Sequence, residues 1–470
     1  MAYAKNRTEI TQAQADQIAA MLSIAPKKPY SKFGGGFGNS PQEEPVHFYN
    51  VVDGVVHLPY LFAASLFQII PNDKIQYPSV PVQFTGTLRP NQVTMVAEAH
   101  EQLQKYGTTT LALPPGTGKT IIGAKLNTML HLLTVVLVHR EILTTQWKKT
   151  YTDNTDASVW IVGEANPPSK CDVIICMDTR WNQIPLAYRN AVGLLIVDEA
   201  HAFCTRSRVP FLLAFHPKFI IIETASLERD DEMHNMMYAM VGKHGIFREI
   251  SDPFYIMKIN TNTVPEVTQN KMGGTDWPAL LKSSLMNERR NRIIIGLVTK
   301  NLDRKILILT LLKEHAEYLY TELVKLNVSC DRLYGTKKGY VDATVLIGTV
   351  SKIGTGFDQA SSCPTYDGRP FDQVILCEPM KKYQMLIQNI GRGFRAKYPT
   401  IQCLVDNNSI FQAHWAVTKR WCITRGGILS EHEIPNTEED IRTEKSSEQT
   451  KKEQMSWAQR KAIQMSMARR

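Results

Sequence analysis

The stretch Leu111-Ala-Leu-Pro-Pro-Gly-Thr-Gly-Lys-Thr120 decides the fold of this chain. The apolar run 109–113 predicts a buried strand, and a helical pattern begins at Lys119. The glycines between them let the backbone fold closely around a phosphate, whose charge is met by N–H groups at the helix N-terminus. Strand, glycine loop and helix in this order predict a phosphate-binding loop.

The residue types of this loop suit a nucleotide and its metal ion. Lys119 is expected to reach the β- and γ-phosphates, and the Thr120 hydroxyl to hold Mg²⁺. Leu113 replaces the usual first glycine, so a chance Gly-Lys-Thr turn is the alternative interpretation, which the later motifs disfavour. The predicted phosphate-binding residues are Pro115, Gly116, Thr117, Gly118, Lys119 and Thr120.

Length and composition indicate a globular protein of two or three domains. The chain has 470 residues, of which 43% are hydrophobic and 21% charged. No apolar run reaches the roughly 18 residues of a membrane span, and no apolar signal segment follows Met1. We therefore expect an intracellular protein that does not cross a membrane. The net charge of +9 permits a polyanionic partner such as nucleic acid but does not establish one.

The cysteines do not follow a metal-binding pattern. None of the eight forms a C-x₂-C pair, so neither a zinc site nor an iron–sulfur cluster is expected. Several lie in apolar runs and are better interpreted as buried free thiols. A reducing compartment fits this usage.

A second motif is Leu194-Leu-Ile-Val-Asp-Glu-Ala-His201. Its apolar residues predict a central strand, and two carboxylates follow at the strand end. A carboxylate is a hard oxygen ligand suited to Mg²⁺, and a neighbouring carboxylate can orient and deprotonate water. We assign Asp198 to the metal and Glu199 to the attacking water. The alternative is a strand that simply ends in solvated acids.

A third motif is Gln388-Asn-Ile-Gly-Arg-Gly-Phe-Arg395, predicted to lie on a helix. Arg392 and Arg395 are three residues apart and are expected on one helix face, where their guanidiniums could stabilise charge on a γ-phosphate. A solvated basic face or a nucleic-acid patch is the alternative. Upstream of the glycine loop, Gln92 offers a donor and an acceptor that match the edges of adenine, although alone it would be an ordinary surface glutamine.

Strands alternate with helices twice along the chain, which predicts two α/β domains with parallel sheets. A small α+β region precedes them, with a helix at 8–23 that Thr11 and Gln14 cap, and a hairpin around Asp53-Gly54. Residues 250–300 lack a strong pattern. The predicted organisation is an N-terminal accessory region 1–83, a first α/β domain 84–250, a junction 251–297, a second α/β domain 298–430 and a charged tail 431–470.

The ordered set of motifs resembles superfamily 2 helicases of the DEAH-box type. Residues 113–120 resemble motif I, 198–201 motif II and Thr224-Ala-Ser226 motif III. Val138 with Gln146-Trp147 is similar to motif Ia, which usually holds the nucleic-acid backbone. Phe84, Arg89 and Gln92 resemble the adenine-reading Q motif. The loop Gly354-Thr-Gly-Phe-Asp358 resembles motif V, with Gly356 and Asp358 as nucleotide contacts, and Gln388, Gly391, Arg392 and Arg395 match motif VI.

This resemblance implies tandem RecA-like domains that bind ATP and Mg²⁺ in the cleft between them, and residues 298–430 would be the helicase C-terminal domain. The segment 88–92 with Gln146-Trp147 resembles the branch that contains XPB-type helicases. The N-terminal region is similar to the poxvirus transcript-release helicase and its relatives in large DNA viruses. That subgroup implies a DNA-dependent ATPase, RNA polymerase or transcription factors as partners, and a virion or cytoplasmic-factory location.

Three other functions stay open at this point. The ATPase motifs do not separate DNA from RNA, so an RNA helicase is one alternative. A double-strand translocase that remodels complexes without unwinding is another. A nucleic-acid-binding scaffold with an inactive ATP fold is the third, and the intact Lys119, Glu199 and Arg395 argue against it.

Overall fold

The computed structural model describes residues 2–26, 44–114, 116–224, 229, 231–249, 253–354, 357–380, 386 and 389–433, without the side chains of 361 and 394. The chain divides into two compact units, Met1–Ile250 with Gly356–Ser361 and Ser251–Thr355 with Ser362–Arg470. Several residues singled out in the sequence lie outside the described part: Pro115, Ala225, Ser226, Gly356, Gln388 and the tail from 434 onward.

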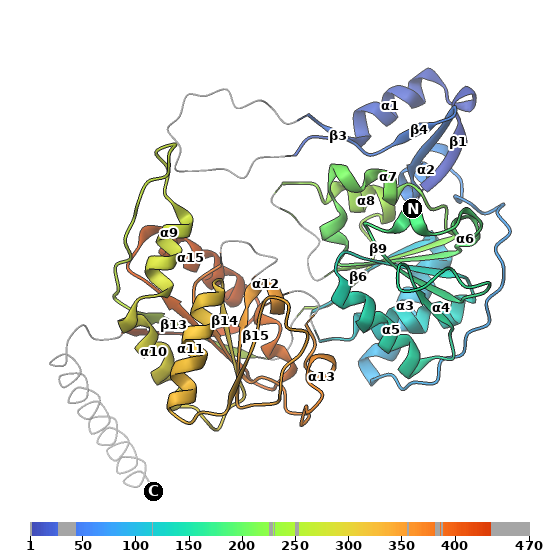
Figure 1. Ribbon diagram of the computed structural model, residues 1–470. Helices are drawn as coiled ribbons and strands as arrows, with labels where there is room; N and C mark the ends of the chain where they lie inside the picture. Colours follow the sequence, from blue (N-terminus) through green and yellow to red (C-terminus); the bar gives the residue numbers. More distant parts are fainter. Residues whose placement is uncertain are drawn as a thin grey trace, which may run out of the picture. The chain divides into compact units, whose positions relative to one another are not determined.

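Unit 1 is built on a seven-stranded sheet in the order β12-β6-β11-β10-β7-β9-β8 (Figure 1). Every pairing in it is parallel, so all strands end at the same edge of the sheet. Ligands of parallel α/β sheets bind outside that carboxyl edge. The strands are β6 (Thr108–Ala112), β7 (Thr134–Val138), β8 (Val159–Ile161), β9 (Val173–Met177), β10 (Leu194–Asp198), β11 (Phe219–Thr224) and β12 (Ile246–Phe247).

Helices and loops cover both faces of this sheet. On one face α3, α4 and α5 pack against alternate strand residues such as Ile196 and Ile221, and on the other the N-terminal region and α8 pack against Val197 and Ile222. Because both faces of the sheet are covered, successive residues of each strand are all buried, which explains why the strands are almost wholly apolar. The helices are α3 (Pro90–Tyr106), α4 (Lys119–Leu130), α5 (Glu141–Asn154), α6 (Leu186–Ala191), α7 (Val209–Leu212) and α8 (Asn235–Val241), with 3-10 turns η2 (Trp181–Gln183), η3 (Ala200–Phe203) and η4 (Arg206–Arg208).

The N-terminal region is a small α+β layer attached to unit 1. The predicted capping box of Thr11 and Gln14 is confirmed, as is the hairpin, in which Asp53 has a φ of 49°. Hydrogen bonds from the side chains of Tyr60 (3.0 Å) and Tyr77 (2.6 Å) reach backbone carbonyls of the turn before β11. Its elements are β1 (Ala2–Asn6), η1 (Arg7–Glu9), α1 (Gln12–Leu22), β2 (Ser23–Ile24), β3 (Val46–His47), β4 (Asn50–Val52), β5 (Val55–Pro59) and α2 (Tyr60–Phe67).

Unit 2 has its own seven-stranded parallel sheet, in the order β15-β16-β14-β17-β18-β13-β19 (Figure 1). The expectation of two α/β domains with parallel sheets is thus confirmed. The strands are β13 (Phe254–Asn260), β14 (Ile306–Thr310), β15 (Cys330–Leu333), β16 (Val345–Thr349), β17 (Gln373–Leu376), β18 (Thr400–Val405) and β19 (Gly427–Glu433).

Strand β13 lies between β18 and β19, in a stretch where the sequence predicted no strand. The helices α9, α10 and α11 cover one face of this sheet, where Ile294, Ile308 and Leu319 are buried together. The helices of unit 2 are α9 (Trp277–Leu285), α10 (Glu288–Thr299), α11 (Lys313–Lys325), α12 (Val350–Ile353) and α15 (Ser409–Thr424), with the 3-10 turn η5 (Gly393–Arg395). The short helix α13 (Gln359–Ser362) lies mostly in the segment that belongs to unit 1.

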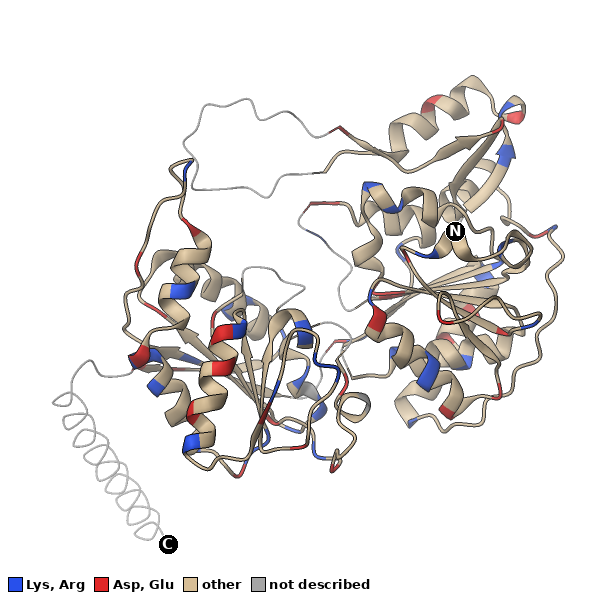
Figure 2. Cartoon of the chain, viewed as in Figure 1, with Lys and Arg blue, Asp and Glu red and all other residues tan. Residues whose placement is uncertain are grey.

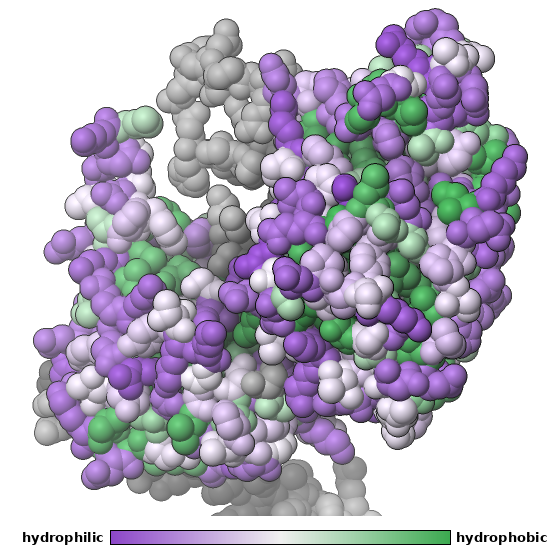
Figure 3. All heavy atoms as spheres, turned by 45° about the vertical axis from the view of Figure 1, so that its right-hand side comes forward, coloured by the Kyte–Doolittle hydropathy of each residue, from purple (hydrophilic) through white to green (hydrophobic). Residues whose placement is uncertain are grey.

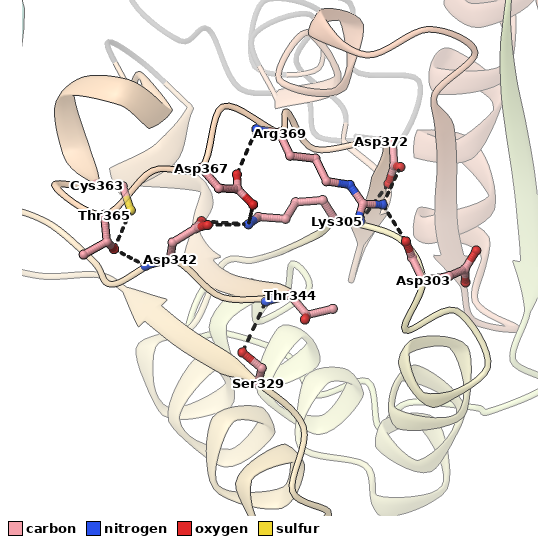
Figure 4. Close-up of polar contacts among 10 residues, drawn as sticks. All are labelled: Asp303, Lys305, Ser329, Asp342, Thr344, Cys363, Thr365, Asp367, Arg369 and Asp372. Carbon is pink, nitrogen blue, oxygen red and sulfur yellow. Dashed lines mark hydrogen bonds and ion pairs between the residues drawn. The ribbon is translucent and has the colours of Figure 1, made fainter.

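A buried lysine holds the amino-terminal edge of the unit 2 sheet (Figure 4). Lys305 precedes β14 and is 4% exposed. Its ammonium lies 2.7 Å from a carboxylate oxygen of Asp342, ahead of β16, and 3.5 Å from one of Asp367, in the loop that leads to β17. The Lys305 backbone N–H also donates to the Asp372 carboxylate at 2.9 Å. The Lys305 side chain therefore connects the start of β14 with the segment before β16 and with the loop that leads to β17.

Charges of both signs and polar residues cover much of the described surface. Along α11 three glutamates lie between the lysines at its two ends (Figure 2), so this helix carries charges of both signs. In the view of Figure 3, hydrophilic residues cover most of unit 1 and apolar ones are exposed in small groups. In the part of the chain that the structure describes, no helix has the length and apolar character needed to cross a membrane.

Candidate nucleotide-binding site

The glycine loop of unit 1 runs from β6 into α4, as the sequence predicted. Gly116 and Gly118 adopt positive φ angles of 84° and 90°, which L side chains rarely tolerate. The Lys119 ammonium donates to the carbonyl of Leu113 at 3.0 Å, so the lysine lies back over the loop. Leu113, which replaces the usual glycine, is buried, and its N–H bonds to the Thr224 carbonyl at 3.3 Å. The leucine thus packs the loop onto the sheet.

Gln92 braces this loop from α3. Its Nε2 donates to the Thr117 carbonyl at 2.9 Å, and its Oε1 accepts from the Arg89 N–H at 2.8 Å. A Cβ on Gly118 would lie 2.3 Å from Gln92 Nε2, which explains why a glycine stands there. The amide keeps one donor hydrogen and one acceptor site, so the predicted contact with adenine stays a prediction.

Strand β10 delivers the two predicted carboxylates beside the loop. Asp198 is its last residue and is buried, and Glu199 follows with a left-handed φ of 52°. Non-glycine residues in this conformation are strained by about 1–3 kcal/mol and cluster at functional sites. Burial, then the neighbouring Glu199, raise the pKa of Asp198 to about 6, while the Trp147 hydrogen bond and Lys119 oppose the shift.

His201 connects this motif to the end of β11. Its Nδ1 lies 3.1 Å from the Thr224 hydroxyl and 3.4 Å from a carboxylate oxygen of Glu199. Burial lowers the pKa of His201, which favours the neutral ring. Thr224, the last residue of β11, is thus connected through the His201 ring to the Asp198-Glu199 motif.

The sequence did not predict that two further residues, Trp147 and Glu223, are buried at this site. Trp147 was expected to belong to a nucleic-acid contact, but it is fully buried and donates from Nε1 to Asp198 Oδ2 at 2.9 Å. Glu223 is also fully buried, at the position of β11 opposite Asp198. Among the described residues its carboxyl oxygens have no hydrogen-bond partner. Burial, then the charge of Asp198, raise its pKa well above the usual value. The sequence feature that could have revealed Glu223 is an acidic residue near the end of an otherwise apolar strand.

The donors beside the loop suit a magnesium ion. Asp198 supplies a carboxylate and Thr120 a hydroxyl, both hard oxygen ligands. No group of three or more His, Cys, Asp or Glu side chains in the described ranges is placed to hold a metal. Mg²⁺ is commonly held by one or two carboxylates together with phosphate oxygens and water, so these residues fit it as the partner of a nucleotide.

The predicted residues of unit 2 form their own arrangement. The guanidinium of Arg392 donates to the carbonyl of Gly354 at 2.9 Å, which joins the third motif to the loop after α12. The predicted helix does not continue through Arg395, because the chain turns after Ile390 into η5. Arg395 is exposed, and Asp358, which lies in the segment assigned to unit 1, is partly buried. Gly356 and Gln388 lie outside the described residues.

Comparisons with known proteins agree with this fold. Residues 85–229 match the family model "Type III restriction enzyme, res subunit". The chain is 29% identical over 427 residues to "Putative helicase 161L" of Invertebrate iridescent virus 6, covering 84% of this chain and 94% of that protein. It is 27% identical over 392 residues to "Putative helicase 055L" of Frog virus 3, covering 78% and 88%.

Two further similarities are more distant. Over 146 residues, 31% of this chain and 33% of the relative, it is 28% identical to "DNA 3'-5' translocase XPB2" of Sulfurisphaera tokodaii. A solved structure of an S. cerevisiae Dbp5 variant bound to RNA and ADP BeF3 has the same fold, with a TM-score of 0.50 at 12% identity, over 77% of this chain and 97% of that one. Both units therefore have a RecA-like fold, and the viral relatives of similar sequence are named putative helicases.

Proposed function

We propose that the protein is an ATP-dependent nucleic-acid helicase or translocase that acts on DNA. One observation carries the proposal: neighbouring strands β6, β11 and β10 bring the glycine loop, Thr224 and the Asp198-Glu199 pair to one sheet edge. A phosphate loop beside a metal-binding carboxylate and an acid for water activation is the set that nucleotide hydrolysis requires.

Each residue of unit 1 then has a defined task. The backbone N–H groups of Gly116, Gly118 and the start of α4 bind phosphate oxygens, and Lys119 adds a positive charge. Thr120 and Asp198 hold Mg²⁺, which neutralises charge on the phosphates. Glu199 orients the attacking water and takes its proton.

The arginines of unit 2 complete the proposal. Arg392 and Arg395 carry guanidiniums that can stabilise charge on the γ-phosphate as it is transferred. Gly356 and Asp358 keep their predicted roles as nucleotide contacts, and Gln388 its predicted catalytic role alongside the arginines. Affinity for the nucleic-acid strand is mostly electrostatic in such proteins, so it should fall as salt is added.

DNA is the favoured substrate because a relative of similar sequence is named a DNA translocase. RNA is the alternative, since the solved structure with this fold was bound to RNA. The viral relatives support a further proposal, that the protein serves transcript release in a DNA virus, in the virion or a cytoplasmic factory. Co-purification with the viral RNA polymerase from infected cells tests that role, and its absence there would contradict it.

The test of the activity is ATP hydrolysis by the purified protein alone, with single-stranded DNA, with duplex DNA and with RNA. We expect strong stimulation by DNA and none in a Lys119→Ala variant. Stimulation by RNA alone would move the assignment to an RNA helicase. ATP binding without turnover under every condition would instead favour the nucleic-acid-binding scaffold.

A further inference from the structure

Helix α5 reaches all three acidic residues at the ends of β10 and β11. Trp147 donates a hydrogen bond to Asp198. At the start of the helix, burial lowers the pKa of the Arg140 guanidinium, and the charge of Glu199 opposes that shift. One turn after Trp147, burial and then the charge of Glu223 raise the pKa of the Tyr151 hydroxyl. A single helix is therefore coupled electrostatically to every carboxylate of the site.

The hydrogen bond from Trp147 links α5 directly to the Asp198 carboxylate. Indole Nε1 lies 2.9 Å from Asp198 Oδ2, and both side chains are withdrawn from solvent. A hydrogen bond to a buried carboxylate is stronger than one in water and restricts rotation of the carboxyl group. The donor is neutral, so it orients the carboxylate without cancelling the charge that attracts a cation.

The indole itself is held firmly. Its ring packs against Tyr151 with centroids 6.0 Å apart. Gly123, in the first turns of α4, faces it closely, since a Cβ there would lie 3.0 Å from Trp147 Cη2 and 2.7 Å from Glu223 Oε1. Trp147 therefore links α5 to the helix that carries Lys119 and Thr120.

We propose that Trp147 is a positioning residue for Asp198, and that α5 thereby controls divalent-cation binding at the nucleotide site. The inference rests on the proposed function only in taking Asp198 as the metal ligand. Groups that hydrogen-bond to a ligating carboxylate orient it, and their loss typically weakens metal binding by about 10–100-fold.

A tryptophan that merely fills the core is the competing explanation, and the chain contains a control for it. Trp160, on β8, is also buried and donates from Nε1, but its acceptor is the Ala165 carbonyl at 3.2 Å. Replacing either tryptophan by phenylalanine removes a bicyclic ring and an N–H donor from the core. Only Trp147→Phe removes a hydrogen bond that a carboxylate accepts.

The experiment measures binding of a fluorescent ADP analogue to the full chain as Mg²⁺ is titrated, with melting temperatures recorded alongside. We expect Trp147→Phe to raise the Mg²⁺ concentration at half-saturation about tenfold, and Trp160→Phe to leave it unchanged. A Trp147→Phe protein that melts lower but keeps the wild-type Mg²⁺ dependence would overturn the inference. Equal shifts in both variants would do the same.

A second substitution covers the case in which Trp147→Phe does not fold. Incorporating 3-benzothienylalanine at position 147 keeps the bicyclic shape and replaces only the N–H by sulfur. The same rise in half-saturating Mg²⁺ is expected, and an unchanged value would overturn the inference. Because no turnover is measured, a wild-type protein that binds Mg²⁺ and ADP but shows no nucleic-acid-stimulated hydrolysis would refute the proposed function alone.

Discussion

Asp198 and Glu223 stand opposite each other at the carboxyl ends of β10 and β11, in register and both buried. Asp198 receives the indole N–H of Trp147, whereas Glu223 has no hydrogen-bond partner among the described residues. A buried polar group without a partner destabilises the fold by about 1–3 kcal/mol. The second carboxyl is therefore a source of instability inside the nucleotide-binding unit.

We predict that Glu223→Leu stabilises the protein. Leucine removes the buried carboxyl and fits the apolar layer formed by α4 and α5, so the free energy of unfolding should rise by about 1–3 kcal/mol at neutral pH. Urea denaturation followed by circular dichroism measures the change. Glu164→Leu, at an exposed glutamate paired with Lys148, is the control and should have little effect. A less stable Glu223→Leu protein would show that this carboxyl is satisfied in solution.

Glu199→Gln should separate catalysis from binding. The amide keeps the size of the side chain but cannot accept the proton of the attacking water, so ATP turnover should fall by about 10²–10⁴-fold. Binding of a fluorescent ATP analogue should stay near the wild-type value. Glu164→Gln is the matched surface control, with unchanged turnover expected. Unaltered hydrolysis by Glu199→Gln would assign the water to another residue.

The candidate nucleotide-binding site could be predicted from the sequence because each of its two motifs in unit 1 is a short contiguous stretch. Residues 109–120 combine a strand, glycines and a lysine in a fixed order, and α4 does begin at Lys119. The Asp198-Glu199 pair likewise follows directly after four apolar residues, and β10 ends at Asp198. In both places, the residues that form the secondary structure and the residues that carry the chemistry lie in the same short stretch of sequence, so one pattern predicts both.

Features that depend on distant contacts were not predictable. Lys258 interrupts the apolar run of β13, and its ammonium lies 3.9 Å from Glu431 on the neighbouring strand, a partner that the local sequence does not reveal. Trp147 was expected to contact nucleic acid because its segment resembles motif Ia, but its burial against Asp198 arises only when α5 packs on the sheet. The turn after Ile390 similarly overrides the predicted helix.

Gly118→Ala should disrupt the glycine loop. The new Cβ would lie 2.3 Å from Gln92 Nε2 at a φ of 90°, so both the loop and its brace must shift. We expect at least tenfold weaker binding of ATP and about 1–2 kcal/mol lower stability. Gly296→Ala in α10 is the matched control, because its added Cβ meets no atom within 4 Å apart from its chain neighbours and the nearby backbone of its own helix. Alanine favours the helix there, so the control should be slightly more stable. Normal ATP binding by Gly118→Ala would refute the tight approach of Gln92.

Lys305→Met should destabilise unit 2. The change leaves Asp342 and Asp367 without their shared cation at a site where Lys305 is 4% exposed, and breaking a buried pair typically costs about 3–5 kcal/mol. Thermal unfolding followed by calorimetry measures it. Lys282→Met is the control, since the Lys282–Glu314 pair is largely exposed and worth under about 1 kcal/mol. Equal effects of the two substitutions would contradict a structural role for the buried lysine.

Glu378→Gln should change how the stability of unit 2 depends on pH. Burial raises the pKa of Glu378, after β17, to about 8, with Arg290 opposing and Asp406 adding to the shift. The folded protein therefore keeps a proton that the unfolded chain loses above its ordinary pKa of about 4.5. Between these two values stability falls as pH rises, by up to about 1.4 kcal/mol per pH unit.

Glutamine cannot titrate and is close in shape to the protonated acid. The variant should match the wild type near pH 5, become progressively more stable than it up to about pH 8, and keep a constant difference above that. Urea denaturation at pH 5, 6, 7, 8 and 9 gives the comparison. Glu314→Gln, on the exposed surface of α11, is the control and should show no such trend. A difference between Glu378→Gln and wild type that does not vary with pH would mean that Glu378 is already ionised in the fold, with Arg290, whose Nη1 has no hydrogen-bond partner in the described structure, as its counter-charge.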